Sequence, residues 1–203
     1  MAVFLDRDGV INENRRDYVK SWDEFVFLPS ALPSLRRLAR TPFTIIVVSN
    51  QSSINRGLVS LSEVNRINER MVKEMREAGG RIDDVYICPH RPDEGCECRK
   101  PKPGLLHRAA DEWSIDLASS YLVGDALSDM QAALAAGCAP ILVLTGRGQE
   151  ELTKMGHYGP IDFLVASDLA ESLEWILRLS TPRYHDNTAS RRRRVLTSLT
   201  RQK

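Results

Sequence analysis

Short apolar runs alternate with amphipathic stretches along most of the chain. The runs are rich in Val, Ile, Leu and Phe and predict buried strands at residues 2–5, 43–48, 84–87, 121–123, 141–144 and 163–165. Between them, helical periodicity predicts helices at residues 30–40, 62–78, 103–113, 127–136 and 168–179. Strands that alternate with helices indicate βα units, so we expect an α/β fold whose mainly parallel sheet is covered on both faces.

Polar side chains directly follow several of these predicted strands. Asp6 and Asp8 follow the first, Ser49 ends the second, Cys88 begins a polar stretch after the third, and Asp125 follows the fourth. Ligands of such sheets bind beyond the carboxyl ends of the strands. We therefore expect these residues to converge on one crevice, an arrangement that indicates an enzyme more than a purely structural protein.

The two acids after the first strand are separated by a single residue. On extended chain both side chains point the same way, and two adjacent carboxylates do not both ionise unless a cation bridges them or one is protonated. Alone, such a pair is typical of a solvated loop or a helix cap. With Asp125 at another strand end, it favours a Mg²⁺ site. Asp6 would attack phosphorus to give an aspartyl-phosphate, Asp8 would act as general acid and base, and Ser49 and Lys100 would stabilise the phosphoryl group.

Three cysteines and a histidine lie within eleven residues of one another, at Cys88, His90, Cys96 and Cys98. Clustered thiols in an intracellular chain favour a metal over a disulfide framework. Three thiolates and an imidazole are a tetrahedral zinc set with no position left for substrate, so the role would be structural. The alternative is a loop with free thiols. Zinc would hold the loop that presents Arg99 and Lys100. The fourth cysteine, Cys138, is predicted to be a small buried apolar residue.

Four motifs in chain order resemble those of the haloacid dehalogenase (HAD) superfamily of phosphatases: FLDRDGV from Phe4, VSNQS from Val48, RKPKPG from Arg99 and VGDALSD from Val123. With CPHRPDEGCECRKP from Cys88, the set is similar to a narrower branch that contains heptose 1,7-bisphosphate 7-phosphatases and histidinol-phosphate phosphatases. The resemblance covers about residues 1–180. It implies a Rossmannoid three-layer sandwich without a separate cap domain, and a magnesium-dependent phosphatase.

The resemblance also implies roles for individual residues. Asp6 is the nucleophile and Asp8 the proton donor, and Mg²⁺ is held by the side chains of Asp6 and Asp125 and the carbonyl of Asp8. Asp129 orients Lys100 or a magnesium-bound water. The implied substrate contacts are Asn50, Gln51, Ser52, Arg99 and Tyr18, the last from a loop at 14–18 whose length is shifted by one. Ala126 is a departure, because some relatives have a Lys there, and any contact made by that Lys is missing.

The choice of substrate depends on the charges of the surrounding loops. A sugar bisphosphate needs a second anion site, and the loops hold Arg15, Arg16, Arg56, Arg91, Arg99 and Lys102. Histidinol phosphate carries a cationic amine and an imidazole, which call for carboxylates such as Glu13 or Asp17. Arg suits phosphate through its planar fork. The excess of basic residues therefore favours removal of the 7-phosphate of a heptose 1,7-bisphosphate, with histidinol phosphate as the alternative.

Charge divides the chain of 203 residues into two parts. Residues 182–203 hold seven basic residues and one acidic residue, whereas 21 basic and 26 acidic residues lie in 1–181, a net charge of −5. We expect a phosphatase domain at 1–181, with a zinc loop at 88–98, and a flexible basic tail at 182–203. The mildly acidic body does not support a chain-wide nucleic-acid surface. A rival of a different class is a zinc-stabilised protein that binds nucleic acid through the tail.

The remaining expectations concern location and partners. No apolar run approaches the roughly 18 residues of a membrane span, and we read no signal peptide at the N-terminus. We therefore expect a cytoplasmic enzyme, and the resemblance implies a monomer. Its partner would be a small phosphorylated metabolite rather than a nucleic acid or a membrane.

Overall fold

The computed structural model describes residues 1–154 and 162–180. Six parallel strands form one sheet in the order β3-β2-β1-β4-β5-β6. They are β1 (Ala2–Leu5), β2 (Thr44–Asn50), β3 (Asp84–Cys88), β4 (Tyr121–Gly124), β5 (Ala139–Val143) and β6 (Leu164–Ala166). The predicted α/β fold is confirmed. Because the order reverses at β1, the ends of β1, β2 and β4 lie beside one another at the switch point where such sheets bind ligands.

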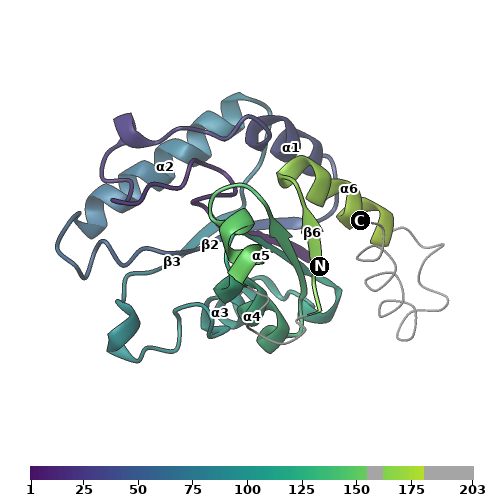
Figure 1. The fold of residues 1–203 in the computed structure, drawn as a ribbon. Coiled ribbons are helices and arrows are strands. Elements are labelled where there is room, and N and C mark those ends of the chain that lie inside the picture. The colour runs from purple at the N-terminus through teal and green to yellow at the C-terminus, as the bar shows by residue number, and fades with distance from the viewer. Residues whose placement is uncertain (155–161, 181–203) are drawn as a thin grey trace.

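Helices cover both faces of this sheet (Figure 1). They are α1 (Ala31–Leu38), α2 (Leu61–Glu77), α3 (Gly104–Trp113), α4 (Leu127–Ala136), α5 (Gly148–Lys154) and α6 (Leu169–Leu179). Single 3₁₀ turns occur at η1 (Trp22–Glu24), η2 (Pro92–Glu94) and η3 (Leu117–Ser119). Helices α1, α2 and α6 pack on one face and α3 and α4 on the other, so the layers are those of a three-layer sandwich. In the residues described, no separate cap domain is present.

The alternation of side chains along β1 divides the core in two. Val3 and Leu5 pack under α1, α2 and α6, whereas Phe4 packs under α3 and α4, and all three are fully buried. Successive strand residues point to opposite faces, so a strand buried on both faces has no polar position. Asp6 is the first residue after this apolar run. The strand therefore fixes where the first acid begins.

Helix boundaries follow local capping signals with one correction. The predicted start at residue 62 is one residue late, because α2 begins at Leu61, directly after its N-cap Ser60, whose side chain accepts the N–H of Glu63. Asp168 caps α6 as expected, by accepting the N–H of Glu171. Helix α5 was not predicted, since a short polar segment shows no apolar periodicity.

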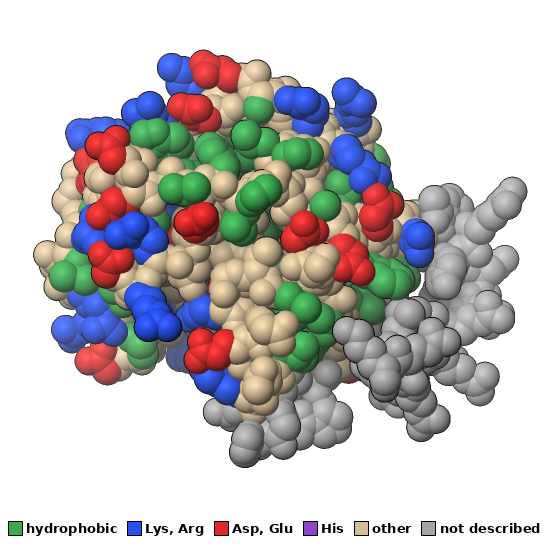
Figure 2. All heavy atoms as spheres, turned by 45° about the horizontal axis from the view of Figure 1, so that its top comes forward, with side chains coloured by type: hydrophobic (Ala, Val, Ile, Leu, Met, Phe, Trp, Pro, Cys, Tyr) green, Lys and Arg blue, Asp and Glu red, His purple; other side chains and the backbone are tan. Residues whose placement is uncertain are grey.

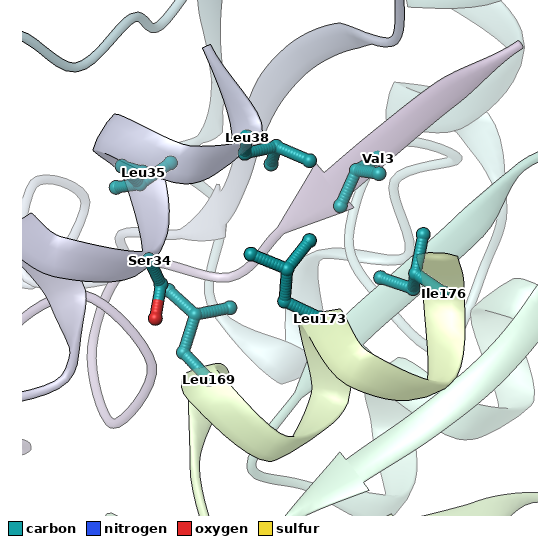
Figure 3. Close-up of a pocket in the computed structure, with 7 residues that line it drawn as sticks. All are labelled: Val3, Ser34, Leu35, Leu38, Leu169, Leu173 and Ile176. Atoms are coloured by element: carbon teal, nitrogen blue, oxygen red, sulfur yellow. The ribbon is translucent and has the colours of Figure 1, made fainter. Parts of the chain in front are cut away.

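The contact between α1, α6 and β1 is closely packed (Figure 3). A void of only about 10 Å³ remains there, lined by Val3, Ser34, Leu35, Leu38, Leu169, Leu173 and Ile176. The side chains of Val3, Leu38 and Leu173 point toward one another across it. A void of this size holds at most one water. Strand β1 thus rests on a firm layer, which limits movement of the acids at its end.

Both signs of charge are mixed on the face that carries α1 and α2 (Figure 2). Along α2 they form ion pairs one turn apart, for example Arg66 with Glu63 and Arg70 with Glu74. This face therefore does not present the broad basic surface that a nucleic acid requires. The predicted flexible tail at 182–203 lies outside the described residues. Among the helices that the structure describes, none is long and apolar enough to cross a membrane.

Candidate active site

The predicted site residues meet in one pocket of about 530 Å³ at the carboxyl edge of the sheet. Its lining includes all of the expected catalytic and substrate residues that project from the strand ends and loops: Asp6, Asp8, Tyr18, Ser49, Asn50, Gln51, Ser52, Arg99, Lys100 and Asp129. Asp125 is fully buried in the floor beside Asp6. Segments more than a hundred residues apart in the chain thus contribute to one cavity, as the strand order predicts.

Three carboxylates form the floor of the pocket. One oxygen each of Asp6, Asp125 and Asp129 lies within 4.8 Å of the others, and all three side chains are buried. Burial, together with the neighbouring acids, raises the pKa of Asp6 to about 6, although Lys100 opposes this. Burial and the charges of Asp6 and Asp129 raise the pKa of Asp125 to about 7. The acids repel one another and lack enough positive charge nearby, which is the condition that a bound cation relieves.

This floor fits a magnesium ion. Mg²⁺ takes oxygen ligands at about 2.1 Å in an octahedron, so two of its ligands lie at most about 4.2 Å apart. Separations within 4.8 Å therefore require only a small side-chain movement for Asp6 and Asp125 to share one ion. Asp129 is the least available of the three, because Lys100 and the N–H of Ala126 already occupy its oxygens.

Lys100 is buried between two of these acids. Its ammonium lies 3.1 Å from Asp6 Oδ1 and 2.6 Å from Asp129 Oδ1, and it donates to the carbonyl of Val48 at 2.7 Å. Burial alone would lower the pKa of Lys100, but Asp129 and Asp6 outweigh it and raise the pKa. The side chain is therefore a fixed positive charge directed at the nucleophile position. Asp129 holds it there, as expected.

Asp8 is surrounded by donors rather than by other acids. Arg7 contacts both of its oxygens at 3.0 and 3.1 Å, Asn12 donates to one at 2.9 Å, and Gln51 donates to the other at 2.7 Å. Burial favours the neutral form, but the Arg7 guanidinium and these hydrogen bonds lower the pKa of Asp8. Arg7 in turn donates to Asn68 of α2. The sequence analysis missed Arg7 and Asn12 as the groups that hold this carboxylate.

Two amides at the end of β2 connect the site. Gln51 donates to Ser49 Oγ at 2.9 Å as well as to Asp8, and so links the predicted general acid to the predicted phosphoryl-binding hydroxyl. Asn50 donates to the carbonyl of Lys100 at 3.0 Å and accepts its N–H at 3.1 Å. Asn50 lines the pocket, but its side-chain amide is used to hold the backbone of Lys100.

The basic residues of the loops do not all reach the pocket. Arg15, Arg16 and Arg99 line it, together with one that the sequence analysis missed, Arg147. The remaining candidates, Arg56, Arg91 and Lys102, do not belong to its lining; Arg91 pairs with Asp93 and Glu94, and Lys102 with Glu97. Arg147 was detectable in principle, because it follows β5 at the same edge of the sheet. The sequence analysis did not consider the residues that follow this strand.

The cysteine and histidine side chains gather into a compact cluster beside this pocket, at Cys88, His90, Cys96 and Cys98. The Sγ atoms of Cys88 and Cys96 are 3.7 Å apart, those of Cys96 and Cys98 are 3.6 Å apart, and Cys88 Sγ lies 3.5 Å from His90 Nδ1. Ligands at the corners of a tetrahedron around zinc lie about 3.8 Å apart, given a Zn–S distance of about 2.3 Å. The donor set and its spacing therefore fit zinc.

Comparison with known proteins identifies the family of this chain. Residues 97–172 match the family model described as HAD-hydrolase-like. On this sheet, the chain has a buried acid after β1, an acid after β4 and, between them in the sequence, a lysine. These features define the chain as a hydrolase of the HAD superfamily.

Individual relatives place the chain more narrowly. The D-glycero-beta-D-manno-heptose-1,7-bisphosphate 7-phosphatase of Bordetella bronchiseptica is 42% identical over 176 residues, 87% of this chain and 97% of that protein. The enzyme of the same name from Pseudomonas aeruginosa is 40% identical, over 83% of this chain and 93% of its own. The chain belongs to the D-glycero-beta-D-manno-heptose-1,7-bisphosphate 7-phosphatase family.

The fold of a solved relative agrees. The crystal structure of D,D-heptose 1,7-bisphosphate phosphatase from B. bronchiseptica, complexed with magnesium and phosphate, has a TM-score of 0.82 at 41% identity and covers 89% of this chain and 100% of its own. The corresponding structure from Burkholderia thailandensis has a TM-score of 0.67 at 34% identity and covers 87% and 97%.

Proposed function

We propose that this chain is a magnesium-dependent phosphatase that removes the 7-phosphate of D-glycero-beta-D-manno-heptose 1,7-bisphosphate. The observation that carries the proposal is that Asp6 and Lys100 line one pocket with an arginine-rich wall, with Asp125 buried directly beside Asp6. Its relatives that carry this name match over most of the chain. A buried nucleophile with a fixed cation beside it suits the transfer of a phosphoryl group, whose charge must be stabilised as it moves.

The reaction begins at Asp6. One of its carboxylate oxygens forms a bond to the phosphorus of the 7-phosphate, and the bond between phosphorus and the sugar oxygen breaks. Lys100 and Ser49 bind the equatorial oxygens of the phosphoryl group. Magnesium, when bound by Asp6, Asp125 and the carbonyl of Asp8, neutralises charge on the same oxygens. The product of this step is an aspartyl-phosphate on Asp6 and the free heptose 1-phosphate.

Asp8 supplies and recovers the proton. In its protonated form it donates to the departing sugar oxygen, and in its ionised form it takes a proton from the water that splits the aspartyl-phosphate to inorganic phosphate. Arg7, Asn12 and Gln51 bind Asp8 as a carboxylate. To donate, its side chain therefore has to turn away from some of these donors, toward the pocket that it already lines.

The pocket wall favours a bisphosphate over histidinol phosphate. Arg15, Arg16, Arg99 and Arg147 line the pocket, against one wall carboxylate, Glu150, besides the acids of the floor. Glu13 and Asp17, the carboxylates that a cationic substrate would use, do not belong to its lining, and Asp17 pairs with Lys20. A dianionic second group is the better match for this wall.

We also infer a structural zinc ion at Cys88, His90, Cys96 and Cys98, and a monomeric enzyme of the cytoplasm. The four cysteines carry free thiols, and three of them lie together in the cluster. Reduced, metal-binding cysteines are typical of a reducing compartment. Metal analysis of the purified protein should give one zinc per chain.

The test is phosphate release from both substrates. We expect release from heptose 1,7-bisphosphate in Mg²⁺, loss of activity in chelator, and recovery when Mg²⁺ is restored. We expect kcat/KM for histidinol phosphate to be lower by a factor of at least about 100, the discrimination typical of sites that lose a bound polar group. A higher kcat/KM for histidinol phosphate would overturn the assignment of substrate but not that of reaction.

A further inference from the structure

The loop between β5 and α5 is pressed against the floor of the active site. Thr145 Oγ1 donates to the carbonyl of Gly9 at 2.6 Å, which ties this loop to the turn that follows Asp8. The N–H of Arg147 donates to Asp125 Oδ2 at 2.9 Å. The loop thus touches both acid-bearing turns of the site, although none of the expected catalytic residues lies on it.

Two glycines allow this close approach. Gly146 has a φ of +57°, and a Cβ added to it would lie 2.3 Å from Asp125 Oδ2 and 2.6 Å from the Cα of Gly9. A Cβ on Gly148 would lie 1.7 Å from the carbonyl oxygen of Val143. Residues with side chains do not fit at either position. The Gly-Arg-Gly sequence therefore brings one long cationic side chain to the pocket at a point where the backbone itself contacts a metal-binding acid.

The Arg147 side chain is free enough to take a ligand. Its guanidinium lies 3.4 Å from Asp125 Oδ1, a long contact, and the side chain is 52% exposed on the pocket wall. A cation held by Asp125 repels the guanidinium electrostatically, and the open side is the pocket. Lys154 lowers the pKa of Glu150 most, and the charges of Arg16 and Arg147 lower it further. Glu150 therefore lies near both arginines. Arg147 and Arg16 therefore border the same part of the wall.

We propose that Arg147 binds the phosphate that is not transferred, the 1-phosphate of the substrate. The proposal rests on the proposed function and adds a residue that selects the bisphosphate. The transferred group already has Lys100 as its fixed cation. Arg147 lines the same pocket, so the loop after β5 supplies a further positive charge to it. A guanidinium binds a phosphate dianion through two parallel N–H···O bonds.

The test compares Arg147→Ala and Arg147→Lys with the unchanged enzyme on two substrates, the 1,7-bisphosphate and the heptose 7-phosphate, which lacks the 1-phosphate. For Arg147→Ala we expect KM for the bisphosphate to rise roughly 10- to 100-fold, the loss of a charged hydrogen bond, while kcat stays within about 3-fold. KM for the 7-phosphate should stay within about 3-fold. Arg147→Lys should recover part of the loss, because it keeps the charge without the fork.

Direct binding gives a second readout. In an Asp6→Asn background with Mg²⁺, calorimetric titration with the bisphosphate should show Kd rising by the same factor when Arg147 is replaced. Arg56→Ala is the matched control, because Arg56 is exposed and lies outside the pocket lining. It should leave both constants unchanged.

Two outcomes would overturn the proposal. Unchanged KM and Kd for the bisphosphate would show that Arg147 does not contact it. Equal losses of kcat on both substrates would show that Arg147 acts on Asp125 or the transferred group instead. Neither outcome affects the proposed function, which fails if the unchanged enzyme releases no phosphate from the bisphosphate or prefers histidinol phosphate.

Discussion

The two clusters of candidate metal ligands in this protein are built in opposite ways. Asp6 is more than a hundred residues away in the chain from Asp125 and Asp129; all three are buried, Asp6 and Asp125 at the ends of β1 and β4 and Asp129 in the first turn of α4. The cysteine and histidine cluster comes from eleven consecutive residues, and three of its four members are only partly buried. In the first cluster the fold arranges the ligands. In the second, we expect a loop with little core of its own to depend on the proposed zinc ion for its shape.

We therefore expect loss of the two metals to have different effects on the protein. Loss of the cation at the acid cluster leaves the sheet intact, because its position depends on apolar packing. Loss of zinc affects the loop that presents Arg99 and Lys100, so its effect on catalysis is indirect. The predictions below test this contrast.

Replacement of the nucleophile should have the largest effect. Asp6→Asn removes the attacking oxygen and should lower kcat by at least about 10⁴-fold, as the loss of a catalytic nucleophile does. The metal-free variant should be at least as stable as the metal-free parent, because a buried repulsion is removed. Phosphate release and thermal unfolding measure the two effects. Substantial activity, after reversion of Asn to Asp by deamidation is excluded by mass spectrometry, would contradict the aspartyl-phosphate route.

Loss of a zinc ligand should come next. Cys98→Ser should release zinc and lower kcat roughly 10- to 100-fold, since the loop no longer holds Lys100 firmly. It should also lower the melting temperature. The matched control is Cys138→Ala, which removes a buried thiol of the core outside the cluster and should retain one zinc per chain. Full activity of Cys98→Ser without bound zinc would break the link between the two clusters.

The amide that joins the two regions should have a smaller effect. Asn50→Ala removes both hydrogen bonds to the backbone of Lys100 and should lower kcat roughly 10-fold, the equivalent of about 1.4 kcal/mol. Asn55→Ala is the control, because Asn55 is exposed and its side chain donates only to Glu94 among the contacts described. It should change kcat less than about 2-fold. Equal effects of the two variants would show that Asn50 does not position Lys100.

The acid cluster should also give the metal-free protein a pH dependence of a few degrees. With pKa values of about 6 for Asp6 and about 7 for Asp125, the folded state binds protons more tightly than the unfolded chain, whose carboxyl groups titrate near 3.9. Stability should therefore fall as pH rises from about 4 to 7. Mg²⁺ should restore it at pH 7 and above, because the ion binds the ionised acids.

Thermal unfolding across this pH range, with and without Mg²⁺, measures the effect. Asp125→Asn should reduce the slope in the metal-free protein. A melting temperature that rises with pH through the same range would contradict the burial of uncompensated acids in the floor.

The sequence was sufficient where one local pattern determines the result. The apolar runs predicted all six strands of the sheet, and the polar residues at their ends predicted which segments meet at the pocket; the substrate-side residues were predicted only by the resemblance to the HAD superfamily. It was insufficient where a role depends on packing between distant segments. The residues next to Arg7 in the sequence do not show that its guanidinium contacts both Asp8 and Asn68 of α2. The sequence around Arg147 does not show that its two flanking glycines bring it into contact with Asp125. The polar helix α5 has no apolar periodicity from which it could be predicted.

The absence of a cap domain from the described residues has a consequence for selectivity. A site enclosed by a lid excludes unwanted phosphate esters by shape, whereas here the arginines Arg15, Arg16, Arg99 and Arg147 stand at a rim exposed to water. Attraction between exposed charges is screened over about 10 Å at 0.1 M ionic strength. Preference for a doubly phosphorylated sugar should therefore weaken as salt is added, while turnover of singly phosphorylated sugars changes little. The ionic composition of its surroundings would then help to decide how narrowly this enzyme chooses its substrate.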